Sequence, residues 1–524
     1  MLYNTLRWLN FRVRSTRSRA APTRPSARPT LELLERREVP TITSITTPSI
    51  VATSSHSPPN DNSFILGSAI GYNSYGNTDT AYITEQTQSG QPQPLTVQLS
   101  FTIMSSTGTV GAATTLVTTQ YDSYGRVISQ LNTIGSAGGD GDGPNAVDCA
   151  AGANGPFAIA YIVNSDHYPN STATQPDYTR ETLYVAQFHA DGTLIGTTAV
   201  TYIENDNPSD TTHRYWLADP KIGVDTYGSY TVVWTYTTQV DPIGGAHAAE
   251  QIQLWESRQG GSTNLVAQSN LDAGINGFGD PADWNGERVK VPDVDTNASG
   301  QSVIVFGRFV TIKNVASEYM DLENVFGQLV DATGALTGSV FAVSQHANTY
   351  EPNAYPAVAM NNSNAFIVSW NYIPPYTIPN SQLPATRGVY ARLWEANGTS
   401  PGEFLVVASP HVETEQHYPY RRANYYVAIT QHPVGMDGNG NFVVGYADET
   451  SDPTSLPTTR VRLQAYHADG SLNGSTVDIG DNGSPFAFGV FQVAMAPDGT
   501  FAVAGRGNPP PVDDEIFAQL FKLT

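Results

Sequence analysis

The sequence predicts an all-β fold, a seven-bladed β-propeller built from four-stranded antiparallel blades. The first observation is a glycine, once an asparagine, that recurs six residues before the last position of a short apolar run. Self-similarity at a nearly fixed period indicates one supersecondary unit repeated along the chain. Successive anchors are separated by 79, 73, 72, 64, 76 and 59 residues, and they are Gly76, Gly155, Gly228, Gly300, Asn364, Gly440 and Gly499.

The second observation is that each repeat divides into four short strands. An apolar strand such as Ile222–Asp225 comes first in each repeat. The turn of Asp, Asn and Gly that follows this strand contains the anchor. Glycine supplies the positive φ that a tight hairpin needs. The second strand usually ends in an aromatic residue, although the seventh ends on Gly505. The third strand alternates around a Gln or Arg, and a glycine pair such as Gly192 and Gly196 precedes the fourth. Four antiparallel strands repeated radially form a propeller blade; a β-solenoid and stacked sandwiches are the alternatives.

The third observation concerns the two ends of the repeat array. The last repeat stops at its third strand, Ile516–Leu523, while the β-branched segment Thr41–Ala52 belongs to no repeat. A ring must close or leave sheet edges exposed. We therefore predict that Thr41–Ala52 completes the last blade. The aromatics that end the second strands should be buried between neighbouring blades, among them Tyr161, Trp234, Trp370 and Tyr446.

Residues 1–40 differ in composition from the rest of the chain. Residues 1–38 contain nine arginines and three glutamates, with no acidic residue before Glu32. Such a polar, basic segment cannot bury enough surface to fold alone. We predict a disordered basic leader over residues 1–40 and a propeller domain over residues 41–524. A short amphipathic helix at Leu31–Arg37 is the alternative for the end of the leader.

Two resemblances accompany these patterns. The run from Leu31 to Pro40, LELLERREVP, resembles the LExLExRxVP element near the start of many exported planctomycete proteins. That resemblance implies an export or sorting address, and an extracellular or cell-surface location. The repeats over about residues 140–520 resemble the AVAMDxDGxFVVxW…VYAQxFDxxG units of large bacterial surface proteins, which implies blade geometry and no particular activity.

Charge and composition exclude several classes of partner. The whole chain has 26 basic and 48 acidic residues, so the part after residue 38 has 17 basic and 45 acidic residues, a net charge of −28. Such a body repels nucleic acid and anionic lipid. No apolar run is long enough for a transmembrane helix. Cys149, the single cysteine, lies in an apolar run typical of a buried residue. We expect a monomer without a cofactor.

A ligand site is expected on one end of the predicted ring. The connections between blades, such as His213–Trp216, and those between the second and third strands are long and share that end, whereas the glycine turns share the other. The connections between second and third strands are expected at residues 164–181, 235–250, 307–324, 371–388 and 447–459. Long loops on a rigid scaffold are where recognition usually occurs. Aromatic faces beside polar groups suit a sugar ring, and a surface protein is the other candidate partner. The expected ligand-binding residues are Trp216, Trp284, Tyr350, Tyr418 and Arg421. The alternative is that these aromatics pack between blades.

Motifs of known chemistry are missing from the sequence. There is no HExxH, GxSxG, P-loop, CxxC or sialidase Asp-box. Plentiful acidic residues leave a carbohydrate-active hydrolase or lyase as an alternative. Asp293, Asp295 and Asn297, like Asp437, Asn439 and Asn441, resemble the start of a calcium loop without its bidentate Glu. A calcium-stabilised scaffold is thus a third reading, although ordinary turn chemistry is favoured. The sequence favours a non-catalytic binding or structural module, and it identifies no catalytic residue.

Overall fold

The structure is a computed structural model of the 524-residue chain, which divides into two units, Met1–Val39 and Pro40–Thr524. All described residues belong to the second unit, so the predicted leader lies outside them. The description covers residues 42–53, 56–57, 61–88, 96–123, 126–131, 147–169, 176, 178–205, 213–240, 249–270, 287–313, 319–345, 348–349, 355–372, 388–408, 433–450, 458–480, 491–507 and 515–524.

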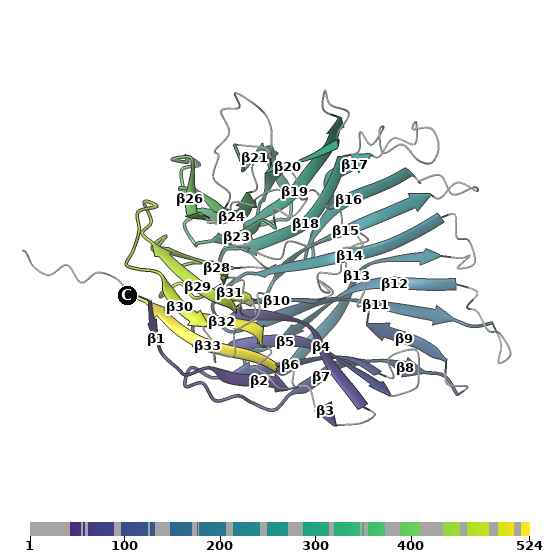
Figure 1. Ribbon diagram of the computed structural model, residues 1–524. Coiled ribbons are helices and arrows are strands. Elements are labelled where there is room, and N and C mark those ends of the chain that lie inside the picture. Colours follow the sequence, from purple (N-terminus) through teal and green to yellow (C-terminus); the bar gives the residue numbers. More distant parts are fainter. Residues whose placement is uncertain are drawn as a thin grey trace, which may run out of the picture. The chain divides into compact units, whose positions relative to one another are not determined.

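The second unit is a seven-bladed β-propeller, as predicted (Figure 1). Each blade is an antiparallel sheet of four main strands. In the order first, second, third and fourth strand, these are β4 Asp61–Tyr72, β5 Thr78–Gln88, β6 Thr96–Met104 and β7 Thr114–Thr118; β10 Val147–Ala151, β11 Phe157–His167, β12 Tyr178–Phe188 and β13 Leu194–Asn205; β14 His213–Val224, β15 Tyr230–Val240, β16 Ala249–Arg258 and β17 Thr263–Asn270; β18 Glu287–Thr296, β19 Ser302–Lys313, β20 Tyr319–Val330 and β21 Leu336–Ala342; β23 Ala357–Met360, β24 Phe366–Tyr372, β25 Gly388–Trp394 and β26 Glu403–Ala408; β27 Val434–Met436, β28 Phe442–Thr450, β29 Thr458–Tyr466 and β30 Val477–Gly480; and, for the seventh blade, β31 Phe491–Met495, β32 Thr500–Gly507 and β33 Glu515–Leu523 with β1 Ile42–Ser44 and β2 Ser49–Thr53. The short strands β3 His56–Ser57, β8 Gln120–Tyr121, β9 Val127–Leu131 and β22 Asn348–Thr349 extend three of these sheets.

The ring closes through both ends of the repeat array. Each first strand contacts the first strand of the next blade, around to β31 against β4 and β4 against β10. In the seventh blade, β1 pairs antiparallel with β33 from Ile42 opposite Leu523, and β2 pairs with the same strand from Ser49 opposite Ala518. The prediction that the segment after the leader completes the last blade is therefore confirmed.

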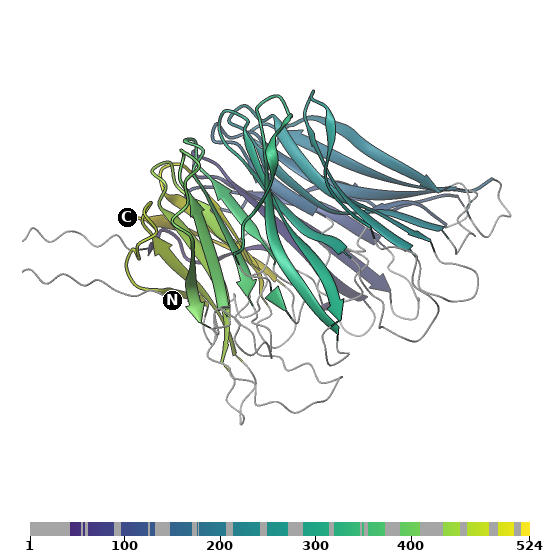
Figure 2. The same ribbon diagram turned by 90° about the horizontal axis from the view of Figure 1, so that it is seen from above.

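The turns between first and second strands share one conformation, in which the anchor has a positive φ and its amide donates to the carbonyl three residues earlier. They lie at the same end of the blades, the turn end (Figure 2). In the third blade, Asp225 Oδ1 accepts from the amides of Tyr227 and Ser229, while the amide of Gly228 donates to the Asp225 carbonyl. Gly228 has φ +90°, a conformation that glycine adopts without strain. Asn364 replaces glycine in the fifth blade at φ +70°, which asparagine tolerates better than other side chains do.

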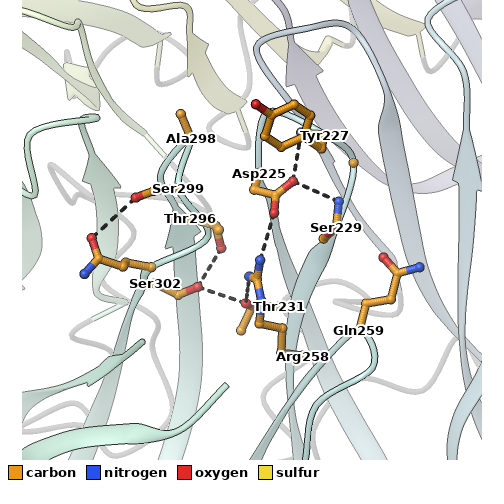
Figure 3. A network of polar contacts seen from close by, with 12 residues as sticks. Asp225, Tyr227, Ser229, Thr231, Arg258, Gln259, Thr296, Ala298, Ser299 and Ser302 are labelled. Carbon is orange, nitrogen blue, oxygen red and sulfur yellow. Dashed lines mark hydrogen bonds and ion pairs between the residues drawn. The ribbon is translucent and has the colours of Figure 1, made fainter. Parts of the chain in front are cut away.

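The Gln or Arg of the third strand reaches the main chain or the next blade. Gln187 Nε2 donates to the carbonyl of Gly228, 2.8 Å away in the following blade. Arg258 forms a buried ion pair with Asp225, 2.8 Å between Nη2 and Oδ2, and Arg258 Nη1 donates to Thr231 (Figure 3). A Cβ atom at Gly300 of the fourth blade would lie 2.1 Å from that guanidinium. A side chain at this position would displace the Arg258 guanidinium and would strain the backbone at φ +84°.

Apolar layers between neighbouring sheets form the core. The rings that end the second strands lie in these layers: Trp234 and Trp370 are each 2% exposed, and Tyr161 and Tyr446 are also buried. Trp370 packs in a cluster that joins the fourth and fifth blades. The predicted burial of these rings is therefore confirmed. They are buried because alternate residues of a strand face opposite sides of the sheet, and each side packs against a neighbouring blade.

The strands are longer than the sequence pattern suggested. The expected loop at residues 164–181 is partly sheet, because β11 and β12 pair from Phe157 opposite Phe188 to His167 opposite Tyr178. The expected loops at 235–250, 307–324, 371–388 and 447–459 are shortened in the same way. Those predicted boundaries were wrong, because polar and threonine-rich strand ends continue the ladder after apolar alternation stops.

Candidate functional site

Trp216 is the one expected ligand-binding residue within the described part of the chain. It was expected in a connection between blades, but it lies inside β14, paired with Thr237 of β15, and is half-buried. The prediction of a loop at His213–Trp216 is thus wrong. Strand β14 extends further from the turn end than the apolar half of its sequence indicates. Trp284, Tyr350, Tyr418 and Arg421 lie outside the described residues.

Glu181 lies against the same stretch of β14. Glu181 is half-buried on β12 of the second blade, and its Oε2 accepts from the amide of Leu217 at 2.7 Å. Burial raises the pKa of Glu181 to about 7, an effect that this hydrogen bond partly opposes. Burial also raises the pKa of Asp166, which lies one residue before the end of β11. A carboxyl group with a pKa near neutrality can exchange a proton at physiological pH.

Acceptor side chains of one blade cap main-chain amides of the next, an arrangement we call the interblade caps. Asp148 accepts from Ile222 N at 2.9 Å, Asp293 from Val358 N at 2.8 Å and Gln492 from Ile70 N at 2.8 Å. Each acceptor lies seven residues before its own anchor glycine, and each amide lies six before its anchor. The first strand is the inner edge of its sheet, where unpaired amides would be costly. The caps satisfy those amides and tie three pairs of blades together.

A buried ion pair adjoins one cap. Lys221 Nζ lies 3.9 Å from Asp148 Oδ1, and both side chains are almost fully buried. Asp219, two residues earlier, has φ +51° and accepts from the hydroxyl of Thr235. Removing one member of such a pair would leave an uncompensated charge. These charges therefore serve the junction between the second and third blades.

A cavity of about 150 Å³ runs along the ring axis. First strands of all seven blades line it, and its lining extends through the turns at Thr226, Asn297, Asn361 and Asp437. Away from the turn end, the lining stops at the level of Asp148. The cavity thus adjoins the turn end, opposite the connections on which the ligand site was predicted.

The two calcium-like motifs are used by the fold itself. Asp437 Oδ1 accepts from the amides of Asn439 and Asn441, and Asn441 Nδ2 donates to Asp437 Oδ2. Asp295 Oδ2 accepts from the amide of Met360 in the next blade. These contacts are ordinary turn and cap chemistry. Within the described ranges, no group of three or more His, Cys, Asp or Glu side chains could hold a metal ion.

The interblade caps and Glu181 are the site features that the sequence did not reveal. The only available signal was a polar residue seven positions before the anchor, at Asp148, Asp293 and Gln492. Its partner is a main-chain amide, which leaves no mark in a sequence. Over the described part of the chain, no helix is long and apolar enough to cross a membrane.

Comparison with known proteins gives similarity of fold alone. No protein-family model and no curated protein sequence matches the chain. A polysaccharide lyase structure is 10% identical, covering 87% of this chain and 89% of its own, at a TM-score of 0.39. An α-L-arabinanase of Penicillium chrysogenum is 10% identical, covering 92% of this chain and 99% of its own, at a TM-score of 0.35. A protein of unknown function from Dyadobacter fermentans is 10% identical, covering 72% of this chain and 94% of its own, at a TM-score of 0.36. Likenesses this weak carry no argument about activity.

Proposed function

We propose that this chain is an exported, non-catalytic propeller that binds a glycan or a surface protein at the end of the ring opposite the turns. The observation that carries the proposal is the position of Trp216, a half-buried tryptophan on the innermost strand of the third blade, beside the amide at which Glu181 is bound. An aromatic face next to polar groups suits a sugar ring or an apolar side chain.

The charges near the axis favour binding over catalysis. Asp148, Asp293 and Asp295 each accept from a main-chain amide of the next blade. A general acid or nucleophile needs a carboxyl that can reach the substrate. Carboxylates that hold the ring together are poorly placed for that role, which supports the non-catalytic reading.

Trp216→Ala tests the proposal, with Trp255→Ala as the matched control. Trp255 is also half-buried in the third blade, but it lies on the third strand, away from the axis. In a screen of immobilised polysaccharides and cell-surface proteins, we expect binding that weakens about tenfold or more in Trp216→Ala and stays unchanged in Trp255→Ala. Binding equally strong in both variants, at matched melting temperatures, would contradict the proposal.

Glu181 favours a second candidate, a carbohydrate-active hydrolase or lyase. Its pKa of about 7 is the value that a general acid needs at neutral pH. If the chain is such an enzyme, the purified protein should release reducing sugar or unsaturated ends from a polysaccharide, and Glu181→Gln should lower that rate 100-fold or more. If the same screen detects binding but no turnover, the result contradicts the enzyme candidate and supports the binding role.

Export is part of the proposal and is supported by the basic segment 1–38 and the element at Leu31–Pro40. The full chain expressed in a planctomycete host should be recovered from the envelope or the medium. The chain without residues 1–40 should remain in the cytoplasm. Equal distribution of the two forms would refute the sorting role of this segment.

A further inference from the structure

The mouth of the axial cavity at the turn end is ringed by seven residues, one from each blade. They occupy the position two residues before each anchor, and most are small, which leaves the axis open. Six of them line the cavity itself. The seven are Ser74, Ala153, Thr226, Ala298, Asn362, Gly438 and Pro497.

Two exposed tyrosines directly follow residues of this ring in the sequence, Tyr75 after Ser74 in the first blade and Tyr227 after Thr226 in the third. Tyr75 is 64% exposed and Tyr227 is 82% exposed. Each directly precedes its anchor glycine, so the two flank the turn of the second blade. The ring of Tyr75 lies over Gly155 of that turn, 3.0 Å from where a Cβ atom would be. The amide of Tyr227 is bound to Asp225, and its ring extends away from the polar network (Figure 3).

Hydrogen bonds hold the turns that carry these rings. The turn of Tyr227 is held by Arg258 at Asp225 and by Gln187 at the Gly228 carbonyl, and turns of other blades are bonded to one another. Ser74 N donates to the carbonyl of Ala153 in the second blade, and Ala298 N donates to Asn362 Oδ1 in the fifth. Gly438 N likewise donates to the carbonyl of Pro497. Direct bonds between turns of neighbouring blades fix the rim, so that little conformational entropy would be lost when a ligand binds.

The cavity size and lining limit the class of ligand. Drug-sized molecules occupy pockets of roughly 300–1,000 Å³, so a cavity of about 150 Å³ holds no more than the end of a chain molecule. Hydroxyl and amide groups reach it from Thr226, Asn361 and Asn362. Thr226 Oγ1 is buried with no hydrogen-bond partner among the described residues, so a ligand hydroxyl could supply one.

Charge decides between neutral and charged saccharides. The part of the chain after residue 38 has a net charge of −28 from the sequence counts, which repels anionic glycans such as uronates. The carboxylates that line the cavity already have partners: Asp437 accepts from turn amides, and Asp148 and Asp295 each accept from a main-chain amide of the next blade. The mouth thus offers hydroxyl and amide groups beside two aromatic faces, the combination that suits an uncharged sugar.

We propose that the turn-end mouth of the axial cavity is a second binding site, for the terminal residue of a neutral saccharide. The Tyr75 and Tyr227 rings stack on the sugar, and Thr226 bonds to one of its hydroxyls. This site lies at the opposite end of the ring from Trp216, and it does not depend on the function proposed above.

Calorimetry with cello-, xylo-, manno- and malto-tetraose tests the proposal on the full chain. We expect at least one of them to bind, with affinity falling about tenfold or more in Tyr227→Ala and Tyr75→Ala but kept in Tyr227→Trp. Tyr202→Ala is the matched control, because Tyr202 is 56% exposed on the outer strand β13.

Three results would overturn the proposal. The first is no binding of any neutral tetraose at millimolar concentration. The second is binding of tetragalacturonate or of the glucosamine tetramer alone, which would indicate a charged ligand. The third is binding that Trp216→Ala abolishes while Tyr227→Ala leaves it intact, which would place the sugar at the other end of the ring and support the first proposal instead.

Discussion

Several buried carboxyl groups in this propeller are poorly compensated, and Glu256 shows the consequence most clearly. Glu256 lies on β16 and is fully buried. Its Oε1 accepts from Asn264, and its Oε2 has no hydrogen-bond partner among the residues that the structure describes. Burial raises its pKa to about 7, against the bond from Asn264 and the charge of Arg258. Burial also raises the pKa of Glu181 to about 7, and it raises the pKa of Asp79 well above its usual range.

These residues predict a fold that is more stable in mild acid. A raised folded-state pKa means that the native protein binds protons more tightly than the unfolded chain, so the Glu256 contribution is complete below about pH 4.5 and is lost as the pH rises to about 7. Urea unfolding should show greater stability at pH 5 than at pH 8. Glu256→Gln should reduce that difference by on the order of 1–3 kcal/mol. Glu395→Gln, on an exposed turn, is the control, and an unchanged difference in Glu256→Gln would contradict the prediction.

At the scale of single elements, the interblade caps stabilise the inner strands. Asp293 accepts from Val358 N across the junction of the fourth and fifth blades. Asp293→Leu should cost about 1–3 kcal/mol because it leaves that buried amide unpaired, and Asp293→Asn should cost less because it keeps an acceptor. Guanidinium unfolding measures both. Asp191→Asn, at an exposed turn, should change stability by less than about 0.5 kcal/mol. Equal losses in Asp293→Leu and Asp293→Asn would show that the cap is not the source of stability.

How far the elements could be predicted depended on which interaction fixes them. Anchor turns such as Asp225–Gly228 and the apolar strands after them have local signatures, and with them the blade number follows from the sequence. Strand ends such as Thr235–Val240 carry no apolar alternation, so they resembled loops. Trp216 was placed in a loop, because only the backbone ladder with β15 shows that it belongs to a strand.

At the scale of the whole molecule, the ring depends on a contact between residues far apart in sequence. The strands β1 and β2 cover β33, where Ile516, Phe517 and Phe521 are buried. Hydrogen bonds from Gln519 to Ser44 and Thr46 also join residues that are more than 470 positions apart in the sequence. We expect this long-range closure to form late in folding, because the loop entropy must be lost before the contact is gained. The seventh blade is thus where the ring is expected to open first.

Deleting residues 41–55 tests this closure. The deletion removes the buried side chains of Ile42 and Val51, worth about 3–6 kcal/mol together, and exposes the edge of β33 to pairing with other chains. We expect a clearly lower melting temperature and aggregation at micromolar concentration, seen by calorimetry and light scattering. A chain lacking only residues 1–38 should melt close to the parent, because it keeps both closing strands. If the chain without residues 41–55 melted at the parent's temperature and stayed monomeric, the two closing strands would contribute little to holding the ring together.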